Sequence, residues 1–367
     1  MTGAREPTVE RGSAHVLYAY EVGQLIDLDG AQRHVTSLTE RASIKHKRRA
    51  PKYFEYQPPP LRVIQGAEPV AFGNHQTGQQ VDLVLFDFGA ISVSYTISLS
   101  GPLSELAVLS EALYDDTALL ADSRRRVAEL LDVVGPAVSR PSMADIAESY
   151  TIFQIQDVSD APMPEQILAG HAHTLAQILR AERQDLSSQE VNDATSCRIA
   201  FGRADLTLID GDAAIVFERD AEDIIAVLEF ANVELLEMHH LDRKLDAALD
   251  EAYRALSRHD WRKVFRPGAA REDLDRIARM QVDGAILFEG INNALKLVGD
   301  EFLARVYRLA SERFHLADWD APILRKLQTL EGIYSKVSDM SANRRMEVLE
   351  WIIIALIAFE IALSFVR

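Results

Sequence analysis

Histidine pairs are the residues of this chain whose type and spacing come nearest to metal-ligand chemistry. His171 and His173 are two positions apart, and His239 and His240 are neighbours. On a helix, side chains at these spacings point in different directions, whereas residues three or four positions apart share a face. The spacing therefore argues against a metal ion at either pair, and we expect no metal centre.

Short motifs that indicate catalysis or cofactor binding are absent from the sequence. It has no Walker A loop, no GxGxxG after a strand, and no HExxH, GxSxG or CxxC. Its one cysteine, Cys197, excludes an internal disulfide and lies in a strand-like run, which predicts a buried small side chain. We therefore predict no catalytic, cofactor-binding or metal-binding residues, and no cofactor.

One short segment concentrates positive charge in an otherwise acidic chain. Such a run could contact anionic lipid or RNA phosphate, and it could equally be a solvated helix end followed by a loop. Tyr53, Phe54 and Tyr56 follow it at once and could stack on bases or begin a core strand. The six residues of this basic run are Arg41, Lys45, Lys47, Arg48, Arg49 and Lys52.

The overall charge limits the classes of partner. The chain of 367 residues has a formal net charge of -17. Binding to a nucleic-acid backbone needs a positive surface, so a protein that coats free nucleic acid is not expected. The N-terminal residues have no apolar core of the kind that a secretory signal requires, and they contain Glu6 and Glu10.

The pattern of apolar residues predicts an α+β protein. After a disordered tail at residues 1–13, residues 14–219 form an α/β body with two related β-β-α units. The first unit is the strand–turn–strand at 82–93 with the helix at 103–113, and the second is the strand–turn–strand at 205–217 with the helix at 221–236. We expect these units to share one sheet.

Residues 220–346 predict long antiparallel helices of a coiled-coil type. Helices are expected at 224–258, at 271–314 and from about residue 321. The third helix carries apolar residues at alternating spacings of four and three, which is a short heptad seam. The seam consists of Ile323, Leu327, Leu330, Tyr334 and Val337.

The last segment, residues 347–367, predicts one C-terminal transmembrane helix. From Val348 to Val366 the only polar residues are Glu350, Glu360 and Ser364. At 1.5 Å per residue such a helix is about 28 Å long, close to the hydrocarbon thickness of a bilayer. Trp351 suits the interface, and Glu360 would face another helix of an oligomer or snorkel to the headgroups. This predicts a single-pass protein with a cytoplasmic body.

The third helix and the tail together resemble the C-terminal signature of the "required for meiotic nuclear division" family, also called the YagE-like family. The resemblance rests on Trp319, on Leu330-Glu331 with Ile333-Tyr334, and on Leu349-Glu350-Trp351-Ile352-Ile353. A looser likeness covers Leu83–Tyr95. The resemblance implies a membrane-anchored tether or scaffold, which in mitochondrial members supports translation, and it implies no catalytic residues.

These features together predict a membrane-anchored, non-enzymatic tethering or assembly factor. Its expected partners are the lipid bilayer, further copies of itself, and a protein or ribosomal partner. Two alternatives stay open. One is a subunit of a CorA-like ion channel or transporter, although that class has two spans joined by a Gly-Met-Asn loop. The other is an unrecognised enzyme in the α/β body, which converging carboxylates with perturbed pKa values would support.

Overall fold

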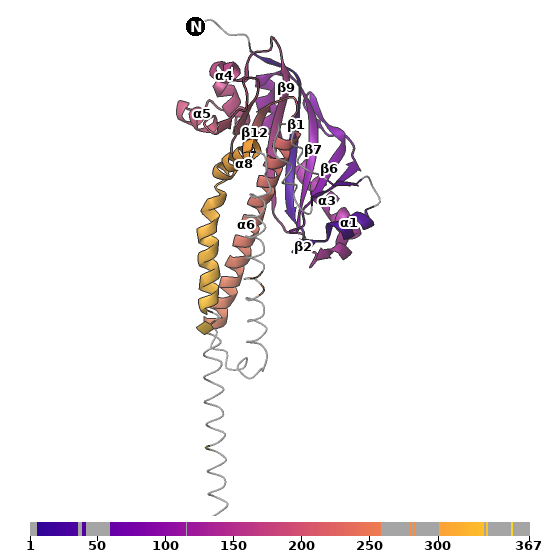
Figure 1. Cartoon of the computed structure of the whole chain (residues 1–367), viewed down its shortest axis with the longest axis vertical. Coiled ribbons are helices and arrows are strands. Elements are labelled where there is room, and N and C mark those ends of the chain that lie inside the picture. Colours follow the sequence, from indigo (N-terminus) through magenta and orange to yellow (C-terminus); the bar gives the residue numbers. More distant parts are fainter. Residues whose placement is uncertain are drawn as a thin grey trace, which may run out of the picture. The chain divides into compact units, whose positions relative to one another are not determined.

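The computed structural model in Figure 1 describes residues 6–35, 39–41, 59–114, 116–257, 279, 282, 301–333, 335–336 and 354. Its strands are β1 (Thr8–Glu21), β2 (Leu25–Ile26), β3 (Thr39–Arg41), β4 (Leu61–Gly66), β5 (Ala71–Phe72), β6 (His75–Leu85), β7 (Ala90–Pro102), β8 (Val138–Ser139), β9 (Ala147–Val158), β10 (Arg198–Ile199), β11 (Leu206–Ile209) and β12 (Ala213–Phe217). Its helices are α1 (Leu28–His34), α2 (Leu103–Leu113), α3 (Thr117–Val134), the 3-10 turn η1 (Gly135–Ala137), α4 (Pro164–Leu179), α5 (Ser188–Ala194), α6 (Glu222–Ser257) and α8 (Glu301–Arg313).

One mixed sheet organises the strands. Within the described residues it has ten strands in the order β10-β11-β12-β9-β1-β7-β6-β4-β3, and β5 pairs with β6 at one end. β12 is parallel to β9, and the other pairs are antiparallel. β1 begins at Thr8, inside the stretch predicted as a disordered tail, because Val9 is buried and pairs with both neighbouring strands. The prediction of disorder is therefore wrong for residues 8–13.

The first face of the sheet carries the largest apolar core. Alternate residues of each strand point to this face, and they pack under α1, α2, α3 and α4. On β7 these residues are Val93, Tyr95 and Ile97, all buried. The alternation expected between residues 91 and 95 therefore places this side of β7 in the core.

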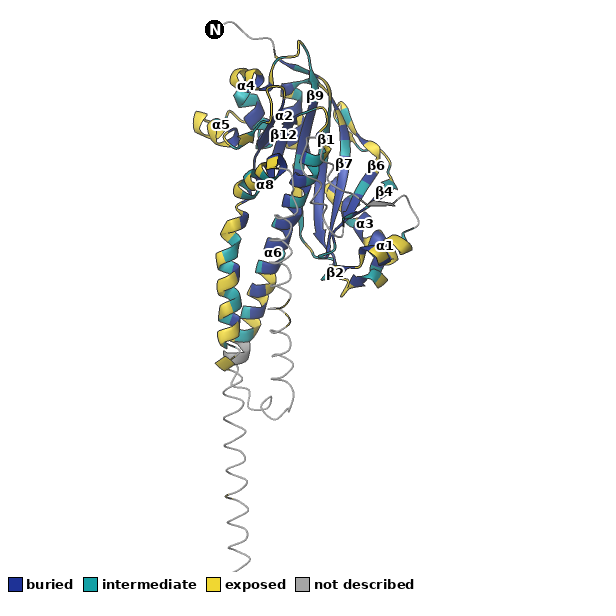
Figure 2. Ribbon diagram, in the orientation of Figure 1, coloured by how far each residue is buried: buried dark blue, intermediate teal, exposed yellow. Residues whose placement is uncertain are grey.

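The second face is covered by α6 and α8 over the strands β9, β12 and β1 (Figure 1). Leu17, Tyr150 and Ile152 of the sheet pack there against Leu228 of α6 and Val306 of α8. Further along α6, Val233 and Leu236 pack on β6 and β7. Figure 2 shows buried residues along these strands and along the first part of α6. The described helices thus cover one part of this face with apolar side chains.

The two predicted strand–turn–strand segments form two hairpins of the same sheet. β6 pairs with β7, and β11 pairs with β12, both antiparallel. The helices that follow them lie on different faces, since α2 packs in the core of the first face and α6 in that of the second. The two segments are thus alike as hairpins but differ in how the following helix packs.

Contacts divide the chain into two compact units, and the division falls within α6. The first unit holds the sheet, α6 as far as His240, and α8. The second unit holds α6 from Leu241 onward and residues 318–333 of the helix that begins at residue 316. The long-helix region predicted at 220–346 is therefore shared between the two units, because the first turns of α6 and the whole of α8 bury apolar residues against the sheet.

No helix in the described part of the chain is long and apolar enough to cross a membrane. The longest described helix, α6, has 36 residues but carries charged side chains in most of its turns. This finding overturns the predicted C-terminal transmembrane helix, and with it the predicted single-pass location with a cytoplasmic body. The bilayer as a partner stays a prediction. The residues on which that prediction rested, Glu350, Trp351 and Glu360, lie outside the described residues.

Candidate functional site

A row of hydroxyl groups runs along one side of β7. Ser92, Ser94, Thr96 and Ser98 alternate with apolar residues, and successive side chains of a strand point to opposite faces. Because Val93, Tyr95 and Ile97 point into the first core, these four hydroxyls belong to the second face. They extend from Ser92, which is fully buried, to Ser98, which is exposed.

Polar residues of neighbouring strands continue this row across the sheet. On β1, Ser13 is paired with Ser98 and His15 with Thr96, while on β6 Asp82 is paired with Ser94. Paired residues of adjacent strands point to the same face, so all of these side chains share the second face. We call this set the polar band, and it consists of Arg62, Asp82, Ser94, Thr96, Ser98, Ser13, His15 and Gln154.

His15 is neutral in this setting. Burial lowers its pKa to about 4, with a smaller lowering from the positive charge of Arg62 and an opposing contribution from the side chain of Gln154. Its Nε2 lies 3.1 Å from the hydroxyl of Ser13, which donates to Oε1 of Gln154 at 3.2 Å. At neutral pH the imidazole can therefore both donate and accept a hydrogen bond.

Glu229 of α6 lies at the border between the polar band and the apolar part of this face. Its Oε1 accepts a 2.6 Å hydrogen bond from the hydroxyl of Ser92. Burial raises the pKa of Glu229, while the hydrogen bond from Ser92 and the charge of Arg62 oppose that rise. Arg62 thus acts electrostatically on both Glu229 and His15, although the three residues come from α6, β4 and β1.

Arg62 is the cation of the polar band. It lies on β4 between Leu61 and Val63, which are buried in the first core, so its side chain belongs to the second face. Among the described residues it has no ion pair, and its buried Nε has no hydrogen-bond acceptor. A buried donor without an acceptor costs about 1–3 kcal/mol. The polar band therefore combines a cation without an ion pair among the described residues, a neutral imidazole and several hydroxyls, which suits hydrogen bonding to a polar ligand.

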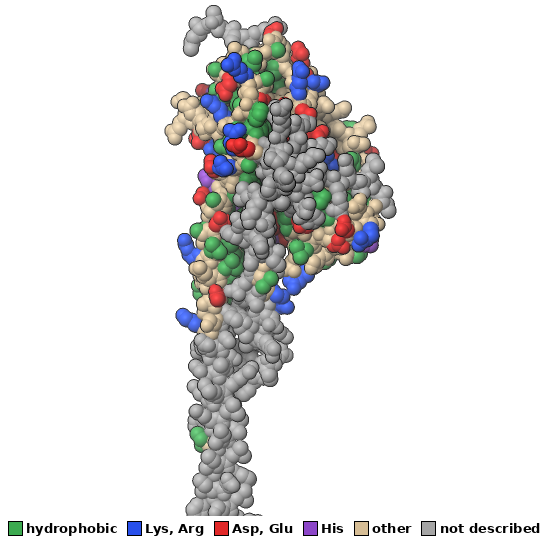
Figure 3. Space-filling view, in the orientation of Figure 1, with side chains coloured by type: hydrophobic (Ala, Val, Ile, Leu, Met, Phe, Trp, Pro, Cys, Tyr) green, Lys and Arg blue, Asp and Glu red, His purple; other side chains and the backbone are tan. Residues whose placement is uncertain are grey.

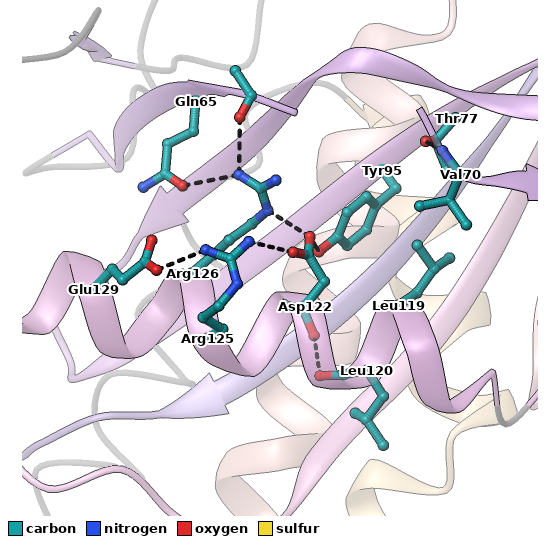
Figure 4. A network of polar contacts seen from close by, with 12 residues as sticks. Gln65, Val70, Thr77, Tyr95, Leu119, Leu120, Asp122, Arg125, Arg126 and Glu129 are labelled. Carbon is teal, nitrogen blue, oxygen red and sulfur yellow. Dashed lines mark hydrogen bonds and ion pairs between the residues drawn. The ribbon is translucent and has the colours of Figure 1, made fainter. Parts of the chain in front are cut away.

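A second polar cluster, on the first face, serves to fix α3 to the sheet (Figure 4). The hydroxyl of Tyr95 donates to Oδ2 of Asp122 at 2.7 Å, and Nε of Arg126 donates to the same oxygen at 2.6 Å. Arg126 also donates to Oε1 of Gln65 and to the carbonyl of Gly66 on β4. Burial, together with the adjacent carboxylate of Asp122, raises the pKa of Tyr95.

A third cluster joins α8 to the loop between β11 and β12. Arg313 donates from Nε to Oδ1 of Asp210 at 2.6 Å, and it also donates to Asp193 of α5 at 2.7 Å. Arg180 of α4 lies 2.9 Å from Oδ2 of Asp210 and donates to Asp193 at 2.6 Å. Figure 3 shows acidic and basic side chains interspersed on the described part of this view. Both clusters use their charges to hold elements together.

The predicted histidine pairs contact carboxylates at separate places. Nδ1 of His239 lies 2.5 Å from Oε1 of Glu148, whereas Nε2 of His240 lies 3.5 Å from Glu21. His173 lies 2.9 Å from Asp185, and the backbone at His171 interrupts α4. Within the described residues, no group of three or more His, Cys, Asp or Glu could hold a metal ion.

The other predicted site residues are described only in part. In the basic run, Arg41 ends β3, and Lys45, Lys47, Arg48, Arg49 and Lys52 lie outside the described residues. In the seam, Ile323 and Leu330 are buried and Leu327 is half-buried, while Tyr334 and Val337 lie outside the described residues. Cys197 is half-buried and lies 3.6 Å from the carbonyl of Leu309. Burial raises the pKa of its thiol.

Sequence reasoning missed the residues of the polar band. The alternation of hydroxyls along β7 was a usable signal, since a strand with one apolar and one polar side has a face outside the main core. Arg62 and His15 gave no such signal. They are 47 positions apart in the sequence numbering, and the order of the strands brings them to one face.

Comparison with known proteins corrects the predicted family. A family model described as "Uncharacterized protein MJ0711, N-terminal domain" matches residues 11–223. The uncharacterized protein MJ0711 of Methanocaldococcus jannaschii is 24% identical over 245 residues, which are 65% of this chain and 72% of that protein. No solved structure matches the chain.

The resemblance to the YagE-like family is therefore wrong. It rested mostly on Trp319–Ile361, a stretch of short motifs in apolar helical sequence, where similar patterns arise from helix periodicity alone. The match found by comparison instead covers the strands and helices of the sheet, from within β1 to the start of α6. Because this match extends over more than half of the sequence, the chain belongs to the family of the MJ0711 N-terminal domain.

Proposed function

We propose that this protein is a non-enzymatic assembly factor, in which the helices of the second unit bind a partner protein, and a second copy of the chain is the first such partner. The observation that carries the proposal is the pairing of two helices in that unit. Nζ of Lys326, on the helix at 318–333, lies 2.6 Å from a carboxylate oxygen of Asp242 and of Asp246, both on α6.

The apolar residues of these helices support a role in association. Leu241, Leu245 and Ala248 of α6 are buried at spacings of four and three, as in a narrow packing seam. Outside that seam, the large side chains of the same unit that are exposed among the described residues are Tyr253 by 52%, Val282 by 56%, Leu324 by 45% and Ile354 by 54%. Large apolar side chains at the surface of a helical pair favour contact with another protein.

The polar clusters of the first unit support a scaffolding role for the sheet. Arg126 with Asp122 and Arg313 with Asp210 connect helices to strands, and their charges are used within the fold. A body held rigid in this way loses little conformational entropy when a partner binds to it.

Self-association is tested on the full-length protein by light scattering after size-exclusion chromatography over a range of concentrations. We expect an oligomer that Leu324→Glu dissociates, because a buried charge at an interface is costly. Val133→Glu is the matched control, since Val133 is 43% exposed on α3 in the first unit. A protein that is monomeric throughout, or two variants with equal effects, would contradict self-association.

Partner binding is tested by affinity purification of the full-length protein at low and at high salt. We expect a protein or ribonucleoprotein partner that is retained by the unmodified chain and lost with Leu324→Glu. A partner that the unmodified chain and Leu324→Glu retain equally would place the interface outside the helical pair. Recovery of the chain alone would restrict the proposal to self-association.

A further inference from the structure

Arg62 differs from the other half-buried or buried arginines of the first unit in having no carboxylate partner among the residues that the structure describes. Arg126 contacts Asp122, and Arg180 and Arg313 contact Asp210, each within 3 Å. For Arg62 the described residues provide no ion pair, and its Nε is buried without an acceptor. A guanidinium is always charged and presents donors in a fork that matches an oxyanion.

Several polar residues lie near Arg62 on the second face. Arg62 is paired with Glu40 of β3 on one side and with Val84 of β6 on the other. Val84 is paired in turn with Ser92, and Asp82 and Ser94 form the next paired position. Adjacent strands are about 4.8 Å apart, so an arginine side chain can reach across one strand toward the hydroxyls of β7. Thr96 and His15 lie beyond them at a further paired position.

The charges of the polar band restrict the kind of ligand. Arg62 attracts an anion, whereas Asp82 repels one and accepts hydrogen bonds from hydroxyl or amino groups. The carboxyl of Glu229 is buried and accepts a hydrogen bond from Ser92, and burial raises its pKa, which favours the neutral form and so reduces its repulsion of an anion. A ligand with an oxyanion for Arg62 and donor groups at its other end is therefore compatible with the negative charge of Asp82.

We propose that the polar band binds a small molecule bearing an oxyanion, either a phosphate or a carboxylate, which is held by Arg62 with the hydroxyls of Ser94 and Thr96. The buried Nε of Arg62 carries this proposal, because an oxyanion supplies the acceptor that the described residues do not provide. The site lies in the first unit, so it is independent of the association proposed for the helices of the second.

Binding is measured on the full-length protein by NMR of the histidine side chains, with inorganic phosphate in one titration and acetate in another. We expect saturable shifts of the His15 signals, because His15 shares the band with Arg62. A response to phosphate alone identifies a phosphate ligand, and a response to acetate alone identifies a carboxylate. Failure of both probes to shift His15 saturably below about 10 mM would overturn the proposal, because affinities weaker than this indicate non-specific contact.

Variants assign the binding to Arg62. Arg62→Met is expected to weaken binding about tenfold or more, and Arg62→Lys to weaken it less, since lysine keeps the charge but not the fork. Arg308→Met is the matched control, because Arg308 is exposed on α8 and its substitution removes the same charge. Equal affinities of the Arg62→Met and control variants would refute the assignment. If Arg62→Met does not fold, Thr96→Val replaces it. This variant is expected to bind the anion severalfold more weakly, and an unchanged affinity would refute the assigned site.

Discussion

The contrast between Asp210 and Asp193 gives a quantitative test of how burial sets the strength of an ion pair in this protein. Both carboxylates contact the same two arginines, Arg180 and Arg313, at distances between 2.6 and 2.9 Å. The Asp210 side chain is 1% exposed, whereas that of Asp193 is 51% exposed. The substitutions Asp210→Asn and Asp193→Asn therefore remove one charge from the same network at two very different depths.

The expected magnitudes follow from that difference. Removing one partner of a buried ion pair costs about 3–5 kcal/mol, because the remaining charge stays desolvated. Arg313 and Arg180 are 18% and 29% exposed and would keep Asp193, so we expect Asp210→Asn to cost about 3 kcal/mol. An exposed ion pair is worth about 0.2–1 kcal/mol, which is the loss expected for Asp193→Asn.

Hydrogen exchange of the α8 amides is the appropriate assay, since Arg313 ends that helix and Asp210 holds it to the β11–β12 loop. A local loss of about 3 kcal/mol speeds exchange roughly a hundredfold, and a loss below about 1 kcal/mol speeds it about fivefold or less. If the two variants speed exchange equally, or if Asp210→Asn leaves α8 protection unchanged, burial does not set the strength of this network and the reasoning is refuted.

Three further outcomes are expected. Glu229→Gln should keep the hydrogen bond from Ser92. Because the pKa of Glu229 is raised in the folded state, the original protein should lose stability as pH rises from about 4.5, and the variant should not. Urea midpoints of both proteins at pH 4.5 and pH 8 check this, and a difference between the two proteins that is the same at both pH values contradicts it. His15, with its pKa lowered to about 4, should show constant NMR shifts from pH 5.5 to 8 and should cost stability as pH falls from 6.5 toward 4; a titration near pH 6.5 would exclude the buried neutral form. Lys326→Met should lower the local free energy of unfolding by about 1 kcal/mol, because it removes both ion pairs to α6, and this loss should appear as faster amide exchange at residues 318–333. If the control Arg325→Met speeds exchange equally, these ion pairs add nothing.

The division of the second sheet face connects the fold with the two proposals. Over β9, β12 and β1, apolar residues of the sheet pack against α6 and α8, and this packing fixes the helices. Over β7, β6 and β4, the same face carries hydroxyls and charged groups together with an arginine for whose Nε the described part of the chain provides no acceptor. A sheet whose one face is half apolar and half polar can hold its helices firmly and still offer groups to a ligand.

The correction of the transmembrane helix shows a limit of reading apolar composition alone. The number of consecutive apolar residues was the criterion for a membrane span, and the run at residues 348–366 was long enough to predict one. Similarly, the short motifs around Trp319 suggested a family that the match over residues 11–223 replaced.

The sequence by itself determined local features of this protein. Alternation of Ser92, Ser94 and Thr96 with Val93 and Tyr95 specified a strand with one apolar side, because side chains of a strand alternate between faces. The segments around Gly89 and Gly211 likewise specified tight strand–turn–strand hairpins.

Only the tertiary structure decided which distant residues share a site. Arg62, His15 and Glu229 interact electrostatically because β4, β1 and α6 meet at one sheet face, and Asp210 meets Arg313 across 103 positions of sequence. Local periodicity fixes the face on which a residue lies, but strand order and helix packing depend on contacts between distant segments. The free energy of these contacts comes from burying apolar surface cooperatively, and no short stretch of sequence contains it.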